Sequence, residues 1–535
     1  MKKLKGLSRD AFNRLYHVHT VTGIVISFAL YVIFFAGAFS LFYDEMAPWE
    51  NPEYRMEFEK DFDFDHHVGE LSTQYDIDFE KEVWLYLPTD VIPKFSVGFY
   101  EKVQDSTEKA DWKEVNLNSQ GEYVLKKESK TTVANTLYKL HYFGQIKTFG
   151  ILLAGFVSLF FLFSVVTGVI VHWANLFTKF YAFIKEGKWK LIWTNAHTVF
   201  GLIGLPFQLI FAITGVALCL LPLAILPAAL LIDEETLNEA AAKVEPWYYA
   251  ELENTPSTQN NLPISKLRNI TQAEYPNHTF GSATLQNYGQ ENAQIVFHAE
   301  DTEGMLGRGH IVRYMKDGRI HDDLSTLPYD KDYFKGVYEY LHVIHFGQFG
   351  GLGLKILYFV MSMITCFMIM AGVMLWRTAR DIKKYTLKQR VFHHQVTKIY
   401  LAISLSLFPA VALLFAANKL VPMGMESRIS YVNAIFFLGW LALTIVGVFW
   451  DKYSQQNRNY AIIGGILSLS VPILNGLVTG GWFWNTFNSF RWVAAVDLFW
   501  LFTGLVSLYL SFFVLKVKAT SDKPSEPKME KAYQL

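Results

Sequence analysis

Histidines beside the ends of long apolar runs are the residues of this 535-residue chain whose type and position favour chemistry. Eight of its 15 histidines lie in such places: His19, His141, His172, His197, His342, His345, His393 and His394. An ionisable side chain at the edge of a membrane helix is costly, so its presence there indicates a function. Neutral imidazole is an axial ligand of haem, and a six-coordinate b-type haem takes two imidazoles from facing helices.

The informative histidines recur together with glycines at two fixed offsets, which indicates an internal repeat. At an offset of 178 residues, His19 matches His197 and Gly37 matches Gly215. At an offset of 204 residues, three pairs match: His141 with His345, Gly168 with Gly372, and Val169 with Val373. The order helix, polar module, helix therefore occurs twice, over roughly residues 10–175 and 190–377. Because both copies run in the same direction, a pseudo-twofold axis along the membrane normal is predicted.

The repeat sorts the candidate ligands into two layers, one at each membrane face. The cytoplasmic layer holds His19, His172 and His197, and the outer layer holds His141, His342 and His345. Symmetry favours His19 with His197, and His172 with His197 is the alternative. In the outer layer the repeat pairs His141 with His345, while His342 is a neighbour or a substitute. The competing interpretation is that these histidines only cap helices or reach lipid headgroups.

Other polar residues near the spans carry weaker predictions. Arg14, Lys190, Arg377 and Arg380 could pair with haem propionates, although orientation signals explain them better. His66 and His67 could touch a metal, but a solvated loop is the preferred interpretation. His393 and His394 are headgroup or haem-edge candidates, and no role is assigned to His278, His298, His310 and His321.

The composition excludes several classes of protein. The chain is 51% hydrophobic and 18% charged, against about 25% charged in soluble domains, which favours a membrane protein. Its 48 basic and 49 acidic residues give no argument for nucleic-acid binding. Two cysteines exclude a disulfide scaffold and a cysteine-held iron–sulfur cluster. Without a Cys-x-x-Cys-His stretch, a Gly-rich dinucleotide fingerprint or a Walker motif, we expect no c-type haem and no nucleotide-binding domain.

Eight apolar runs are long enough to cross a bilayer, which predicts a polytopic α-helical membrane protein. They lie near residues 19–43, 149–173, 198–231, 353–376, 397–417, 430–450, 460–480 and 492–516. The first is expected to be a retained signal anchor, and Pro206, Pro222 and Pro227 predict a kink or a re-entrant end in the third.

The basic residues near the span ends predict the orientation, because Lys and Arg are enriched in cytoplasmic loops. They are Lys2, Lys3, Lys5, Arg9 and Arg14, then Lys179, Lys185, Lys188 and Lys190, then Arg377, Arg380, Lys383, Lys384, Lys388 and Arg390, with a lysine-rich tail. With eight spans all of them fall on one face. Both termini are therefore expected in the cytoplasm of a bacterium, with the protein in the inner membrane.

The polar segments between spans are expected to be two small α+β modules in the periplasm. Alternating residues predict strands at 83–87, 95–100, 294–298 and 311–314, with a turn at 316–319. The predicted parts are residues 1–43 (N-terminus and first span), 44–147 (first module), 148–232 (second and third spans), 233–345 (second module), 346–377 (fourth span), 397–516 (four additional spans) and 517–535 (cytoplasmic tail).

Several motifs over about residues 10–377 resemble those of the PepSY-associated transmembrane proteins, which include iron-regulated ferric-siderophore reductases. They are Leu140-His141-Tyr142, the stretch from Thr167 to His172, the stretch from Ala196 to Gly201 with Leu205-Pro206-Phe207, and the stretch from His345 to Gly351. The resemblance implies that the second outer segment is a PepSY module. It further implies a four-helix core with two b-type haems on His19, His141, His172, His197 and His345, without settling the ligand pairs.

The expected function is transmembrane electron transfer that reduces a ferric siderophore or a similar ferric chelate in the periplasm and releases Fe(II). Membrane quinol or a cytoplasmic reductase is the expected electron donor. One alternative is a transporter of iron or a related solute with histidine proton relays, kept open by Asn475 and Asp497 in the last two spans. The other is a non-enzymatic regulator whose outer modules bind envelope partners.

Overall fold

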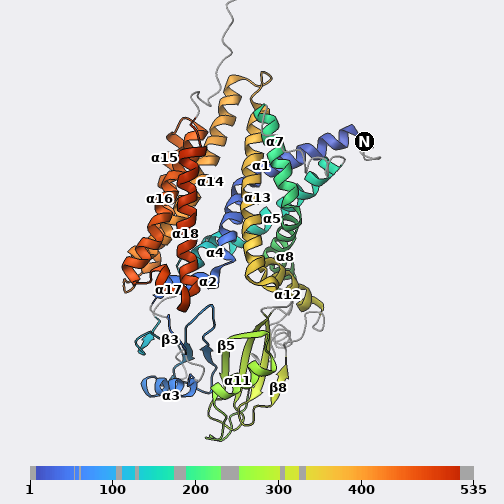
Figure 1. Ribbon diagram of the computed structural model, residues 1–535. Helices are drawn as coiled ribbons and strands as arrows, with labels where there is room; N and C mark the ends of the chain where they lie inside the picture. The colour runs from blue at the N-terminus through green and yellow to red at the C-terminus, as the bar shows by residue number, and fades with distance from the viewer. Residues whose placement is uncertain are drawn as a thin grey trace, which may run out of the picture. The chain divides into compact units, whose positions relative to one another are not determined.

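The chain forms two compact units in a computed structural model (Figure 1), which describes residues 8–52, 55–58, 62–103, 111–126, 132–173, 188–229, 252–301, 308–323 and 333–517. The helical unit comprises Met1–Ser40, Thr132–Val216 and Phe359–Leu535, and the sheet unit comprises Leu41–Thr131 and Ala217–Tyr358. The basic residues Lys2, Lys3, Lys5, Lys179 and Lys185, and the tail from residue 518, lie outside the described residues.

The described part contains seven helices that are long and apolar enough to cross a membrane, and a bent pair that would make an eighth span. The seven are α1 (Arg9–Ser40), α5 (Lys147–His172), α13 (Gly351–Arg380), α14 (Leu387–Leu420), α15 (Arg428–Phe449), α16 (Tyr453–Thr479) and α18 (Arg491–Tyr509). The chain is thus a multi-pass helical membrane protein, as the composition predicts.

The bent pair consists of α7 (Trp189–Ile203) and α8 (Leu205–Ala229), whose axes differ by 69°. The bend falls at Gly204, two residues before Pro206. Because proline has no backbone N–H and its ring crowds the preceding turn, a straight helix cannot run through this point. The kink predicted for the third apolar run is confirmed.

The first span begins ten residues earlier than its apolar run, at Arg9. Ser8 Oγ accepts a hydrogen bond from the backbone N–H of Ala11 at 3.1 Å, which is the arrangement of an N-terminal cap. One turn on, Arg14 and Asp10 form an exposed ion pair at 3.0 Å. Local polar contacts therefore extend the helix beyond the apolar run, and His19 lies in its third turn.

Shorter helices connect the spans and the sheet. They are α2 (Tyr43–Glu50), α3 (Phe64–Gln74), α4 (Val133–His141), α11 (Ile264–Glu274), α12 (Tyr333–Phe346) and α17 (Phe483–Ser489), with 3₁₀ turns at Gly144–Ile146 and Gln348–Gly350 and a π-helical turn at Leu510–Val514.

The last four spans pack beside one another and against α1 and α4 of the helical unit (Figure 1). On α4, Thr132 Oγ1 accepts from Asn418 Nδ2 at 2.6 Å, and Thr136 Oγ1 donates to Asn433 Oδ1 at 2.5 Å. The rings of Phe39 and Trp500 stack with centroids 6.1 Å apart. The additional spans therefore support the two helices that carry His19 and His141.

The sheet unit contains eight antiparallel strands in one sheet of order β4-β3-β2-β1-β5-β6-β7-β8. The strands are β1 (Val83–Tyr86), β2 (Ser96–Tyr100), β3 (Trp112–Leu117), β4 (Tyr123–Leu125), β5 (His278–Gln286), β6 (Gln294–Asp301), β7 (Arg308–Tyr314) and β8 (Ile320–Asp323). Each polar segment contributes a helix and four strands, and β1 pairs with β5. The four predicted strands are confirmed, but the segments share one sheet instead of folding as separate modules.

Helices α3 and α11 pack on the same face of this sheet. Phe64 and Val68 of α3 and Ile264 and Leu267 of α11 are buried in one core with alternate residues of the strands, such as Leu85. Removing these apolar side chains from water is the main stabilising contribution to such a two-layer unit.

On β3, Glu114 accepts hydrogen bonds from Lys94 Nζ at 3.2 Å and from Lys126 Nζ at 2.5 Å, and its side chain is 11% exposed. Burial alone would raise the pKa of Glu114, but the two ammonium groups outweigh it and lower this pKa. The ion pairs therefore stabilise the fold at pH values above the pKa that Glu114 has in the unfolded chain. This stabilisation is lost as the pH falls through the lower pKa of Glu114 in the folded protein.

We expect Glu114→Gln to destabilise the sheet by about 1–3 kcal/mol at pH 7, and by less at an acidic pH below the folded-state pKa of Glu114. Hydrogen exchange of the β2 and β3 amides, corrected for the intrinsic rate at each pH, measures this difference against the unmodified protein. Glu122→Gln, on the adjoining β3–β4 turn, serves as the control. A difference of the same size at both pH values would contradict the ion-pair explanation.

Candidate functional site

His19 of α1 and His197 of α7 lie ring to ring in the helical unit. Their ring centroids are 6.1 Å apart and their planes differ by 60°. A metal–imidazole bond is about 2 Å long and the ring centre lies about 1 Å further, so two imidazoles on opposite sides of one metal have centres about 6 Å apart. The spacing therefore fits two axial ligands of one metal ion.

Each of these two rings is held by a hydrogen bond to a backbone carbonyl. His19 Nδ1 lies 2.9 Å from Ser164 O in α5, and His197 Nδ1 lies 3.0 Å from Met368 O in α13. A carbonyl oxygen only accepts, so each Nδ1 must carry the proton and each Nε2 keeps its lone pair. Metal-binding histidines show this arrangement, because the second hydrogen bond fixes the tautomer and the ring orientation.

A glycine lies under each ring, four residues after the carbonyl that binds it. A Cβ atom on Gly168 would lie 3.1 Å from His19 Cε1, and one on Gly372 would lie 3.0 Å from Cε1 and Nδ1 of His197. The absence of a side chain at these positions lets the imidazoles approach the helices closely. The two glycines, like the two carbonyls, are separated by the offset of 204 found in the sequence.

His141, at the end of α4, makes the same contacts with α1. Its Nδ1 lies 2.8 Å from Ile33 O, and a Cβ atom on Gly37 would lie 2.5 Å from that nitrogen. Gly37 again follows the carbonyl residue by four positions. The combination of a histidine, a backbone carbonyl and a glycine thus occurs three times, at His19, His141 and His197.

The turn after His141 has strained backbone. Phe143 and Lys147 have φ values of +58° and +48°, a conformation that costs non-glycine residues about 1–3 kcal/mol. The turn after His345 has the same form around Gly347 and Gly351, with φ values of +66° and +55°. In both turns a 3₁₀ segment lies between the two positive-φ residues. This local likeness supports the equivalence of His141 and His345.

The other outer-layer candidates lie on α12 of the sheet unit. The rings of His345 and His342 contact Phe346, with centroids 5.4 Å and 4.4 Å away. His172, the alternative partner predicted for His197, is the last residue of α5. The ring of His19 lies against the ring of His197. Gly215, the counterpart of Gly37, faces Ser158, whose Oγ would lie 2.7 Å from an added Cβ.

The remaining predicted residues are placed as follows. Arg377 pairs with Asp381 at 3.5 Å, and the Arg380 guanidinium lies over Trp376 at 4.8 Å. His66 and His67 lie in α3 and not in a loop, because Asp63 caps that helix by accepting from the His66 N–H. Burial lowers the pKa of His67, whose Nδ1 lies 2.7 Å from Tyr123 Oη.

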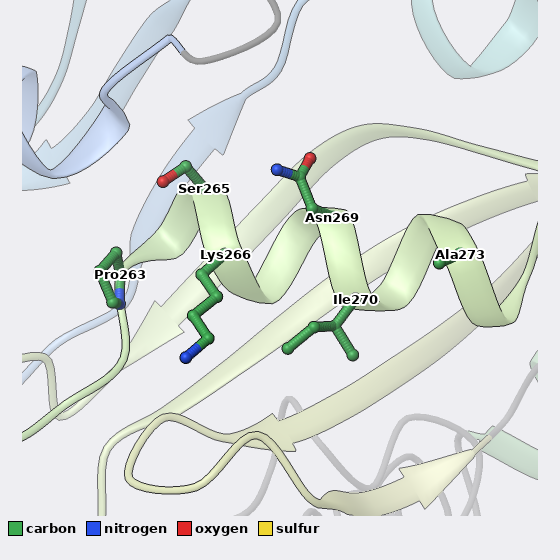
Figure 2. Close-up of a pocket in the computed structure, with 6 residues that line it drawn as sticks. All are labelled: Pro263, Ser265, Lys266, Asn269, Ile270 and Ala273. Carbon is green, nitrogen blue, oxygen red and sulfur yellow. The ribbon is translucent and has the colours of Figure 1, made fainter.

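Two further features of the described residues bear on ligand binding. No group of three or more His, Cys, Asp or Glu side chains in this part is arranged to hold a metal ion. A surface hollow follows the exposed side of α11 (Figure 2) and is lined by Pro263, Ser265, Lys266, Asn269, Ile270 and Ala273. None of the predicted site residues lines this hollow.

His394 has no partner that the sequence alone indicates, and the structure places it against Tyr453 at the start of α16. His394 Nδ1 and Tyr453 Oη are 2.6 Å apart, and both residues are buried. Across β6 and β7, His298 and His310 also meet, with their Nδ1 atoms 3.0 Å apart. Strand alternation could have placed the second pair on one face, whereas no local sequence signal joins residues 394 and 453.

The family of the PepSY-associated TM region matches residues 16–379. The matched segment contains all six histidines proposed as ligands and ends before α14. No curated protein matches the chain.

Proposed function

Because the chain belongs to the family of the PepSY-associated TM region, we propose that it is a haem-bearing electron-transfer protein of the bacterial inner membrane. In this proposal it passes electrons outward to a ferric chelate in the periplasm, most simply a ferric siderophore. Reduction to Fe(II) releases the iron, because oxygen-rich chelators hold the divalent ion much less tightly.

The observation that carries the proposal is the pairing of His19 and His197. Their ring centroids are 6.1 Å apart, and each Nδ1 is bound to a carbonyl, which leaves Nε2 as the ligand atom. His19 and His197 would hold the iron of a haem through their Nε2 atoms. A bound haem would supply a one-electron couple at this layer. The protein residues orient the imidazoles and exclude water from the site.

For the outer layer, the sequence repeat alone proposes His141 and His345 as ligands. His141 has the same carbonyl and glycine contacts as the first pair, and His345 occupies the equivalent place before a turn of the same form. His342, one turn earlier on α12, is the substitute ligand. Two haems, one near each face, would divide the thickness of the bilayer into shorter electron-transfer steps.

The orientation in this proposal follows from the charges. Basic residues lie at the His19–His197 end of the spans, as at Arg377, Arg380 and Lys388, so that end is assigned to the cytoplasm and the sheet unit to the periplasm.

An optical spectrum of the detergent-purified protein, oxidised and then reduced with dithionite, tests the proposal, with a pyridine haemochrome assay for haem per chain. We expect two low-spin b haems, and reduction of a ferric chelate by the reduced protein, detected with a colorimetric Fe(II) chelator. A colourless protein from haem-replete cells would exclude electron transfer and favour the transporter hypothesis.

The transporter hypothesis draws little support from Asn475 and Asp497. Asn475 Nδ2 donates to Asp497 Oδ2 at 2.8 Å and to the carbonyl of Gly481 at 3.0 Å, and both side chains are fully buried. A hydrogen-bonded pair that also holds the turn after α16 fits a structural role. The regulator hypothesis predicts that the spans tolerate replacement of every layer histidine.

A further inference from the structure

A second group of titratable and aromatic side chains lies where α13 ends and where α14 and α16 begin. It consists of Trp376, Arg377 and Asp381 near the end of α13, His393 and His394 in α14, and Tyr453 in α16. We call it the donor cluster. Four of its members, Asp381, His393, His394 and Tyr453, lie beyond the segment that matches the family, and the last three belong to the additional spans of this chain.

His393 has a ring nitrogen that is unpaired among the residues that the structure describes. Its ring lies edge-on to Trp376, with centroids 5.0 Å apart, and to Tyr385 at 5.6 Å. Its Nδ1 is buried and has no hydrogen-bond partner among the described residues. Leaving such a buried polar atom without a partner is unfavourable. Beside it Phe392 is 60% exposed, so an apolar molecule dissolved in the bilayer can reach this side of α14.

Charged groups connect the cluster to the polar end of the helices. The Arg377 guanidinium lies 5.4 Å from the centre of the Tyr453 ring and 3.5 Å from Asp381, which also binds Arg390 at 2.7 Å. These charged side chains place the cluster beside the polar end of the helices.

The cluster is also close to the first histidine pair along α13. Gly372 packs under His197, and Trp376 follows it by four residues, which places both on one face about 6 Å apart along the axis. Since Trp376 contacts His393, its indole lies between that histidine and the turn of α13 that packs under His197. This placement suits a donor of electrons.

We propose that the donor cluster binds and oxidises a membrane-dissolved hydroquinone. This inference rests on the proposed function, because it names the electron donor of that pathway. A hydroquinone is apolar enough to reach the Phe392 side from the bilayer, and its hydroxyl group can donate a hydrogen bond to His393 Nδ1.

The reaction balances without a further cofactor. Both hydroquinone O–H bonds break and two C=O bonds form, so one molecule gives a quinone, two protons and two electrons. His393 Nδ1 takes the first proton, releases it to water at the polar end of the helices, and then takes the second. The electrons leave singly toward His197, and two ferric ions are reduced outside for each hydroquinone oxidised.

Duroquinol is the probe, mixed with the oxidised, full-length protein in detergent while the haem absorbance is followed. We expect His393→Ala to slow haem reduction at least tenfold and to leave haem content and dithionite reduction unchanged. His393→Gln, which keeps a hydrogen-bonding side chain but not a base, should lower the maximal rate more than the apparent affinity. Lys388→Ala, an exposed position on α14, is the matched control.

A fluorescent hydroxyquinoline N-oxide, whose emission is quenched on binding, gives a measurement that needs no haem. If the purified protein contains no haem but still quenches the probe in a way that depends on His393, the hydroquinone site is supported and the proposed electron-transfer function is contradicted. Equal duroquinol rates in the unmodified and His393→Ala proteins would overturn the site. If a soluble NADH-dependent flavoprotein reduced the haem and duroquinol did not, the hydroquinone site would also be overturned, and the electron donor would be assigned to the cytoplasm.

Discussion

The pyridine haemochrome assay on the His197→Ala protein is expected to give one b haem per chain, where the unmodified protein gives two. Alanine removes the Nε2 ligand and also breaks the hydrogen bond from Nδ1 to the Met368 carbonyl. A haem held by His19 alone would become high-spin or dissociate, while the His141 layer keeps its own contacts. Electron transfer from hydroquinone to the ferric chelate should fall by more than about 100-fold, because the first step is lost.

Variants of the neighbouring histidines make this result specific. His19→Ala should reproduce the His197→Ala spectrum, whereas His172→Ala should keep both haems, because His19 holds the place opposite His197. His17 is exposed on α1, two residues before His19, and His17→Ala serves as the matched control. Loss of a haem in His172→Ala, with none in His19→Ala, would assign the pair to His172 and His197 instead.

The sequence predicts which histidines form the candidate site, but it does not predict the backbone carbonyls that fix their rings. The offsets of 178 and 204 identify His19, His197 and the glycines, because a repeat preserves residue types. The carbonyls of Ser164, Met368 and Ile33 carry no such signal, since any residue supplies a backbone oxygen. Their role depends on which helices pack together, and only the structure gives that packing.

Long-range pairing explains what the sequence alone did not predict about the fold. Alternation identifies β1, β2, β6 and β7 as strands but not their partners, and it does not identify β5, the strand that joins the two segments. An edge strand can pair with any free edge. The separate modules predicted for the two polar segments therefore share one sheet. In the same way, His393 and Trp376 meet only because α14 returns beside α13, so the donor cluster could not be assembled from local patterns.

A single added methyl group at Gly37 is expected to have a large effect on the outer haem. A methyl group there would lie 2.5 Å from His141 Nδ1 and 2.7 Å from its Cε1, which no Cβ atom tolerates. The ring must move off α1 and lose its bond to the Ile33 carbonyl. Gly37→Ala should therefore abolish or make high-spin the outer haem alone, and such overpacking costs about 1–3 kcal/mol of stability.

Gly23→Ala, on the same helix, separates this effect from helix propensity, because nothing lies within 4 Å of a Cβ at Gly23. Alanine is favoured over glycine inside helices by about 1 kcal/mol, so Gly23→Ala should be neutral or stabilising with two intact haems.

Gly168→Ala should have an effect between those of Gly37→Ala and Gly23→Ala. Its Cβ would lie 3.1 Å from His19 Cε1, so we expect the inner haem to be retained with a shifted midpoint potential. The three spectra and midpoint potentials therefore rank the glycines by their distance from an imidazole. If Gly37→Ala and Gly23→Ala gave the same spectra and midpoint potentials, the packing of His141 against α1 would not matter for haem binding. That result would contradict His141 as the outer ligand.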